Sequence, residues 1–481
     1  MKKKYLKRAQ VILLAMLCGA SVASAQITFQ EIYPSTIHES GRDVLQTSDG
    51  GYIIAASTET SIVNDLDVMV VRTDAYGTIL WKQTYGGGSL PEVPNCILKA
   101  ADGNYFIVGY SQSTGSGDFD HYLLKIDPAG TLIFSKRYGG YGNEDAKEII
   151  ATADGNYMIV GASNSVSFSD NNVQLIKIDI SGNVIATKNY GGPGYESARS
   201  VKQCSDGGFI VAGKRVALSG IASIFLIRTN PAGDTLWTRI HSDVNSMEGK
   251  SILVNSDNSY TLSVDDSSAT VDSDVRVMKL DPSGSTILWN KRYGGNDKDI
   301  TKLIKPTSDG GYIVTAMSRS FGWIDPDYWL LKINSVGDTA WSRHYGGADH
   351  EHCYAVKETS DGGYITVGHT RSNPPRIEHI LFIKLNSNGE LGPVGIDENA
   401  LNENALNLYP NPSTGIVNIN FVGNYEPGSI LKITDTMGKL IYSQKMDGQN
   451  NSFDLKNNRP GLYYISMQSQ KQSITKKLIL N

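Results

Sequence analysis

The sequence predicts an all-β protein: a seven-bladed β-propeller whose N-terminal strand closes the last blade, followed by a small C-terminal β-sandwich. Three observations predict it: a hairpin sequence that recurs seven times at nearly fixed spacing, strand-like runs in every repeat, and one strand placed before the first repeat and missing from the last. The expected division is a signal peptide over 1–25, the propeller over 26–392, a linker over 393–406 and a C-terminal domain over 407–481.

The repeated sequence is a tight turn between two strands. "SDGGYIIAA" begins at Ser48 and returns in near-copies such as "ADGNYFIVG" and "SDGGFIVAG". The Asp of each copy recurs in steps of 51 to 53 residues: Asp49, Asp102, Asp154, Asp206, Asp257, Asp309 and Asp361. Periods of this size are typical of propellers, solenoids and module arrays. Asp caps such turns and Gly accepts their positive φ, so we interpret these Asp residues as structural rather than catalytic.

Each repeat contains four short strand-like runs and no helical periodicity. In the first repeat the runs are "DVLQTS", "YIIAAS", "DVMVVRT" and "TILWKQTY", separated by turns rich in Gly and Asp. β-branched and aromatic residues bounded by such turns favour strands. Four strands joined by hairpins form one antiparallel sheet, and sheets of this kind repeated around an axis are propeller blades.

The two ends of the repeat region complement each other. The last strand of a repeat ends in Tyr, or once in His, and "ITFQEIYP" places such a Tyr, Tyr33, ahead of the first repeat. The seventh repeat lacks this strand after "LFIKLNSNG". The N-terminal strand is therefore expected to complete blade seven and to cover an open sheet edge. An aromatic residue usually stands four positions before the Tyr, and its recurrence favours packing between blades over sugar binding.

The N-terminus predicts export. A basic start, an apolar run over 11–18 and the small residues Ala23-Ser24-Ala25 have the layout of a secretory signal peptide. That leader carries five of the 44 basic residues, which leaves 39 basic against 49 acidic residues and a net charge of −10. An acidic chain argues against nucleic acid as a partner.

The longer loops between strands vary from repeat to repeat, and they are expected on the face opposite the tight turns. Ten residues before the Asp of the turn, six of the seven repeats carry an acid on this face: Glu39, Glu92, Glu144, Glu196, Asp299 and Glu351. A ring of acids near the axis suggests a bound ligand or divalent cation. The alternative is that each carboxylate accepts backbone N–H groups of its own "YGG" loop, and the recurrence favours it.

An unrepeated group of histidines lies in the loop before blade seven. "ADHEHCY" contains His350 and His352, His369 begins the next loop on the same face, and His38 holds the matching position in blade one. Histidines within reach of one another suit a transition metal, although this spacing matches no zinc motif and surface histidines are common. The sequence predicts no other cofactor.

A polar loop of blade six contains three aromatic residues without counterparts in the other repeats: Phe321, Trp323 and Tyr328. Exposed aromatic rings suit sugars, and the alternative is that the loop folds onto its own hydrophobic side chains. The chain contains no GxSxG, HExxH or phosphate-loop motif.

The C-terminal segment is a compact run of strand-like sequence after a polar linker. Its landmarks are Tyr409, Pro410, Asn411, Pro412, Asp435, Gly438, Gly461, Tyr463, Lys476 and Lys477. With these landmarks the segment resembles the type A C-terminal sorting domain of the type IX secretion system of Bacteroidetes-type bacteria. The resemblance implies passage through the periplasm, recognition by the type IX machinery, and a cargo that is anchored to the outer-membrane surface or secreted.

Two functional hypotheses remain open. The leading one is a monomeric, secreted or surface-bound binding or adhesion module for an extracellular glycan or protein. The alternative is a secreted hydrolase or lyase that degrades polysaccharide in the propeller funnel. An unrepeated acid or His/Tyr set that converges on the variable face would favour the enzyme.

Overall fold

The computed structural model describes these residues: 26–59, 65–86, 90–112, 119–165, 171–192, 194–217, 219–243, 245–267, 273–320, 325–392, 406–421, 430–435, 440–446, 448, 450–468 and 473–480. The predicted signal peptide and most of the predicted linker lie outside them. All the secondary structure of the described residues is β-strand, as the sequence predicts, and these residues include no helix long and apolar enough to cross a membrane.

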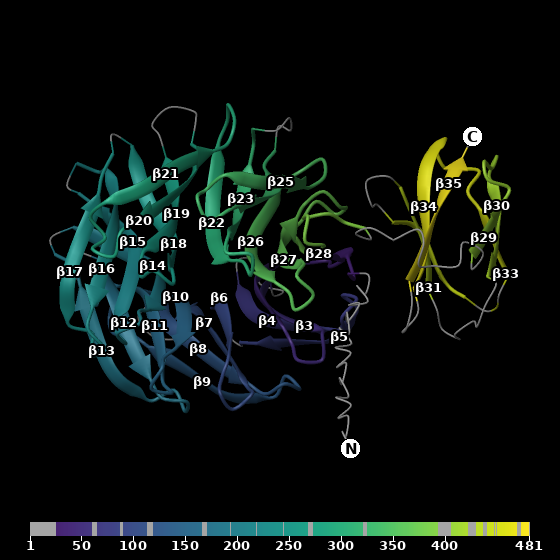
Figure 1. Cartoon of the computed structure of the whole chain (residues 1–481). Helices are drawn as coiled ribbons and strands as arrows, with labels where there is room; N and C mark the ends of the chain where they lie inside the picture. Colours follow the sequence, from purple (N-terminus) through teal and green to yellow (C-terminus); the bar gives the residue numbers. More distant parts are fainter. Residues whose placement is uncertain are drawn as a thin grey trace, which may run out of the picture.

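The described strands before residue 392 form four-stranded antiparallel sheets, seven in all (Figure 1). Six sheets take consecutive strands: β2 (Glu39–Gln46), β3 (Tyr52–Glu59), β4 (Leu66–Thr73), β5 (Ile79–Tyr85); β6 (Glu92–Lys99), β7 (Tyr105–Gln112), β8 (Phe119–Ile126), β9 (Leu132–Tyr138); β10 (Glu144–Ala151), β11 (Tyr157–Ser163), β12 (Asn172–Ile178), β13 (Val184–Tyr190); β14 (Tyr195–Gln203), β15 (Phe209–Val216), β16 (Ala222–Thr229), β17 (Thr235–His241); β18 (Ser246–Val254), β19 (Tyr260–Ser267), β20 (Val275–Leu280), β21 (Ile287–Tyr293); β22 (Asp299–Pro306), β23 (Tyr312–Ser318), β24 (Asp327–Ile333), β25 (Thr339–Tyr345).

The remaining sheet joins the two ends of this region. It contains β26 (Glu351–Glu358), β27 (Tyr364–Thr370) and β28 (His379–Leu385), and its fourth strand is β1 (Phe29–Tyr33). β1 runs antiparallel to β28, with Phe29 opposite Lys384 and Tyr33 opposite Ile380. The first strands of the sheets also pack on one another in the cyclic order β2, β6, β10, β14, β18, β22, β26 and again β2. Together these features give a propeller fold.

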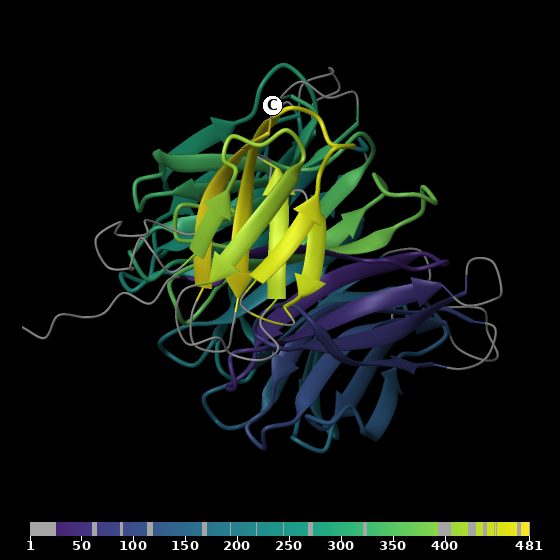
Figure 2. The ribbon, with the colours of Figure 1, turned by 90° about the vertical axis from the view of Figure 1, so that its right-hand side faces the viewer.

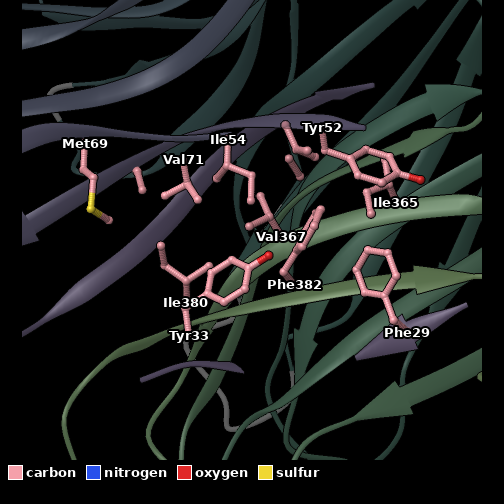
Figure 3. Packing of buried hydrophobic residues seen from close by; sticks show 13 residues of the cluster. Phe29, Tyr33, Tyr52, Ile54, Met69, Val71, Ile365, Val367, Ile380 and Phe382 are labelled. Carbon is pink, nitrogen blue, oxygen red and sulfur yellow. The ribbon is translucent and has the colours of Figure 1, made fainter. Parts of the chain in front are cut away.

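The hydrophobic core lies between adjacent sheets. Figure 3 shows the cluster between the first and last sheets, to which β1 contributes Phe29 and Tyr33. The ring of Phe382 lies with its centroid 5.1 Å from that of Phe29 and 5.4 Å from that of Tyr52. Because β-branched and aromatic side chains fill the space between sheets, each sheet depends on its neighbours for burial.

The recurring Tyr of each fourth strand forms a hydrogen bond between its own sheet and the next. Its hydroxyl donates to the backbone carbonyl of the Gly in the neighbouring sheet's second tight turn. These pairs are Tyr33–Gly77, Tyr85–Gly130, Tyr138–Gly182, Tyr190–Gly233, Tyr293–Gly337 and Tyr345–Gly389, and His241 bonds Gly284 in the same way. The aromatic ring four positions earlier lies against the same Gly in most sheets, as with Trp81 at Gly130. These aromatic residues therefore pack between sheets.

Replacing Tyr190 by Phe is expected to lower the free energy of unfolding by about 1 kcal/mol, because the carbonyl of Gly233 then loses its hydrogen bond. The bond is 2.6 Å long and Tyr190 is buried. Urea denaturation of the purified protein measures the loss. Tyr141→Phe is the matched control, since this ring is 81% exposed, and its unfolding curve should overlay that of the unchanged protein. Equal effects of both substitutions would contradict a stabilising hydrogen bond between Tyr190 and Gly233.

The Asp of every "DG" turn forms an ion pair with a basic residue of its own sheet's third strand. The pairs, with N–O distances of 2.5 to 3.3 Å, are Asp49–Arg72, Asp102–Lys125, Asp154–Lys177, Asp206–Arg228, Asp257–Lys279, Asp309–Lys332 and Asp361–Lys384. Partial burial opposes ionisation, but hydrogen bonds from Lys332 and Thr307 lower the pKa of Asp309 to about 2. These acids are structural, as expected from the turn sequence.

The C-terminal strands form two sheets that face each other. β29 (Leu406–Tyr409), β30 (Ile416–Phe421) and β33 (Asn450–Asp454) make one sheet. The other contains β31 (Ile430–Asp435), β32 (Leu440–Lys445), β34 (Gly461–Gln468) and β35 (Ser473–Leu480) (Figure 2). Val417 and Phe453 of the first sheet and Ile433 and Leu478 of the second share one buried core. This is the predicted small β-sandwich.

Candidate functional site

The first strand of every propeller sheet is interrupted by a β-bulge at the same place. The pairing with the second strand skips one residue, which is Arg42, Asn95, Lys147, Arg199, Lys250, Lys302 or Tyr354. A bulge leaves its extra residue outside the regular alternation of the strand and re-aims the side chain. Five of these seven residues are cations. We call the seven the bulge ring.

The cations of the bulge ring are close enough to influence one another across the fold. Burial and the nearby cations Lys250, Arg199 and Arg42 together lower the pKa of Lys302 to about 8, with Asp265 opposing them. Arg199 and Arg42 belong to β14 and β2, which are not neighbours of β22. The side chains therefore converge on the centre around which the first strands pack.

Three of the five cations are neutralised by acids. Lys147 contacts Asp145, and Arg199 Nε lies 2.6 Å from a carboxylate oxygen of Glu248. Lys250 Nζ lies 2.6 Å from the other oxygen of Glu248. Although burial alone would raise the pKa of Glu248, Arg199 and Lys250 lower it to about 2. This part of the ring is a closed ion-pair network.

Arg42 and Lys302 are different because each contacts an aromatic ring instead of pairing with an acid. The guanidinium carbon of Arg42 lies 4.6 Å from the ring centre of Tyr354, and Lys302 Nζ lies 5.8 Å from it. Both are cation–π contacts. Arg42 donates one long hydrogen bond of 3.5 Å to Ser57, and its Nε is buried without a hydrogen-bond partner in the described chain.

Three of the four predicted histidines come together beside these residues. The ring of His352 stacks between those of His350 and His369, at centroid distances of 4.9 and 5.0 Å. The Nε2 atoms of His350 and His352 are 2.9 Å apart, and His369 Nδ1 is 2.9 Å from Ser40 Oγ. His38 is nearby: its Nδ1 accepts the backbone N–H of Glu378, whose carboxylate lies 3.8 Å from His369.

The histidine cluster is held neutral. Burial, followed by the effect of His369 and Lys302, lowers the pKa of His352 to about 3. Burial and Arg42 place the pKa of His369 well below its ordinary value. The described residues contain no group of three or more His, Cys, Asp or Glu side chains placed to hold a metal ion. The predicted metal site therefore has clustered imidazoles but not a complete ligand set.

The acids at the start of the first strands are buried and bind groups of their own sheet. Glu351 accepts hydrogen bonds from Thr370, Ser372 and the backbone N–H of Gly347. Equivalent backbone bonds reach Glu144 from Gly140, Glu196 from Gly192 and Asp299 from Gly295. Glu39 binds Lys82, and Glu92 binds Ser111 and Arg137. Four of the six acids therefore accept a backbone N–H of their own loop, as the capping alternative describes, whereas Glu39 and Glu92 bind side chains.

Tyr328 does not form the expected aromatic platform. It is the second residue of β24, fully buried, and its hydroxyl contacts that of Thr366 in the next sheet. The prediction of an exposed ring was wrong because Tyr328 belongs to the strand and not to the polar loop. Phe321 and Trp323 lie outside the described residues.

Most landmarks of the C-terminal segment can be placed. The Asn411 side chain accepts the backbone N–H of Ile479 and donates to the carbonyl of Lys477, which ties the Tyr409–Pro412 turn to β35. Tyr463 is buried and donates to the carbonyl of Arg459. Asp435 ends β31, Gly461 begins β34, and Lys476 and Lys477 lie on β35. Gly438 lies outside the described residues.

Comparison with known protein families identifies the C-terminal segment. Residues 407–481 match the family described as "Secretion system C-terminal sorting domain", which confirms the predicted sorting domain and directs the chain to the cell surface or to secretion. No curated protein matches the sequence.

Several solved structures are similar to the chain at low identity. They include a protein of unknown function from Dyadobacter fermentans (11% identity, TM-score 0.46, covering 74% of this chain and 97% of that one). They also include polysaccharide lyase Uly1 (8%, 0.49, 72% and 90%) and the β-propeller domain of the Trilobed protease from Pyrococcus furiosus (11%, 0.43, 79% and 99%). At these values the similarities carry no statement about chemistry.

Proposed function

We propose that this exported chain is a monomeric binding or adhesion module whose propeller holds an extracellular glycan or protein at its centre without chemical turnover. In this proposal residues 26–392 form one closed seven-bladed propeller, with β1 as the outer strand of the last blade. Residues 1–25 are the removed leader, 393–406 the linker, and 407–481 the part that the type IX machinery recognises.

The observation that supports this proposal is the bulge ring beside the histidine cluster. Propellers bind their ligands where variable side chains meet on a rigid frame. The bulge position differs between sheets while its surroundings repeat, so it is the variable part of a constant scaffold. Asn95 and Tyr354 are the two uncharged members of the bulge ring, so its positive charge is distributed unevenly around the centre.

A second candidate function is supported by the contact of neutral imidazoles with Tyr354. Its ring centre lies 5.8 Å from those of both His352 and His369, and Arg42 stacks on the same ring. A neutral imidazole or a tyrosine next to cations can remove a proton from a substrate. This arrangement is the unrepeated His/Tyr set that a polysaccharide-degrading enzyme would need.

A glycan-array screen of the purified protein, followed by an assay for released sugar on every glycan that binds, separates the two candidates. Binding without release is the expected result. Release of sugar that His352→Ala abolishes would establish the enzyme instead. The absence of binding to every glycan, with capture of an extracellular protein, would support the protein-ligand form of the module.

A further inference from the structure

The centre of the propeller carries positive charge that the protein itself does not neutralise. Lys147, Arg199 and Lys250 are paired with acids on one side of the bulge ring. Arg42 and Lys302 on the other side form no ion pair with any described residue, and Asp265, the acid that acts on Lys302, is itself paired with Lys250. Removing a cation from water without a counter-charge is costly, so an anion bound between these two side chains would be stabilised.

The orphaned guanidinium nitrogen marks where that anion would be held. Arg42 Nε is buried and has no hydrogen-bond partner in the described chain. Guanidinium groups pair with carboxylate, sulfate and phosphate oxygens through parallel N–H bonds. Lys302 contacts the same Tyr354 ring, with its Nζ 5.8 Å from the ring centre, and supplies a second positive charge.

The imidazoles and the phenol beside these cations are neutral and polar, and the nearby Glu378 carboxylate is paired with Arg371. His352 and His369 are uncharged near neutral pH because burial and the adjacent cations oppose their protonation. A neutral imidazole offers one donor and one acceptor, and the Tyr354 hydroxyl offers both. Such groups suit the hydroxyls of a sugar ring, whereas the side chains of an acidic peptide beyond the carboxylate offer little for them to bind.

We propose that Arg42, Lys302, Tyr354, His352 and His369 form an axial site for an acidic sugar, with the sugar's carboxylate or sulfate group held between Arg42 and Lys302. The inference rests on the proposed binding function and names its ligand class. It assigns the cations to the anionic group and the imidazoles and the phenol to the sugar hydroxyls.

Isothermal titration calorimetry of the purified protein tests the assignment. The probes are a glucuronate-containing oligosaccharide, a sulfated oligosaccharide, a neutral oligosaccharide of equal length and a polyglutamate peptide. We expect one or both acidic saccharides to bind, and the Arg42→Gln and Lys302→Gln variants each to weaken that binding by about tenfold or more.

Arg376→Gln is the matched control, because it removes the same charge from a side chain that is 78% exposed in the loop between β27 and β28. Its affinity should stay within about twofold of the unchanged protein, since exposed charges act weakly through water. Circular dichroism confirms that each variant is folded. A variant that does not fold is replaced by Arg42→Lys, which keeps the charge and loses the paired N–H geometry, and which should also weaken binding.

The results of this titration distinguish a wrong ligand class from a wrong binding function. Binding of the neutral saccharide or of polyglutamate in preference to the acidic saccharides would overturn the acidic-sugar assignment and leave a binding module. Binding of acidic saccharides that Arg42→Gln and Arg376→Gln weaken equally would also overturn it, because attraction would then come from general charge. No binding of any saccharide or peptide would count against both.

Discussion

Replacing Asp327 by Asn is expected to stabilise the protein above pH 7 by roughly 2–4 kcal/mol and to change little at pH 4. Burial, together with the nearby Glu351, raises the pKa of Asp327 to about 7. The folded state therefore keeps a proton that the unfolded chain, with an Asp pKa of about 4, has already released. The stabilising contribution of the protonated Asp327 side chain is full below pH 4 and is lost as pH rises through 7. An Asn side chain stays neutral over this whole range.

Another propeller sheet already has Asn beside a buried Glu at the position that corresponds to Asp327. A Cβ on Gly346 would meet the carboxylates of Asp327 and Glu351, and a Cβ on Gly191 would meet Asn172 and Glu196 in the same way. Asn is therefore accommodated beside a buried Glu at this position of the repeat.

Urea denaturation at pH 4 and pH 8 measures the effect of Asp327→Asn. Asp325→Asn, which removes the same charge two residues earlier, should show no such difference between the two pH values. A stability gain for Asp327→Asn that is equal at both pH values would contradict the pairing of the two carboxyl groups.

Replacing Gly109 by Ala is expected to destabilise the protein by about 3 kcal/mol or to prevent folding. A Cβ at this position would lie 1.8 Å from the carbonyl oxygen of Val93 and 2.9 Å from the Cα of Pro94. Both atoms belong to the backbone of the bulged strand β6, so no side-chain rotation relieves the overlap.

Gly192→Ala is the matched control for Gly109→Ala, because no atom lies within 4 Å of the Cβ that it would add. Urea denaturation of both variants measures the difference, and insoluble Gly109→Ala protein beside soluble Gly192→Ala protein gives the same answer. Unchanged stability of Gly109→Ala would show that β6 and β7 can separate freely at the bulge.

The strands and their grouping follow from local sequence, because alternation, turn residues and the spacing of the repeat all describe one sheet at a time. The pairing of β1 with β28 also could be predicted, since a strand ending in Tyr33 preceded the first repeat and the last repeat lacked one. Each ion pair of the "DG" turns was missed, although a basic residue recurs 22 or 23 positions after the Asp, as Lys332 does after Asp309.

The site was predictable only in part. His350, His352 and His369 were expected near one another because the loops that carry them lie on one face. The bulge ring was missed because a single skipped residue changes which side chain faces the centre, and regular alternation does not reveal it. Arg42, Lys147 and Lys302 nevertheless stand at one fixed distance, three residues after the recurring acid, so an alignment of the repeats contains the signal.

The partnership of β1 with β28 sets the order in which the chain can finish folding. Phe29 meets Lys384 across a loop of more than 350 residues, and closing such a loop is slow compared with forming the hairpins within one sheet. Until β1 pairs with β28, Phe29 and Tyr33 on β1 and Phe382 on β28 remain open to solvent, and the free edge of each of these strands can pair with other chains. A ribosome-bound or truncated chain that ends before β26 would therefore be prone to aggregate, whatever the stability of its finished sheets.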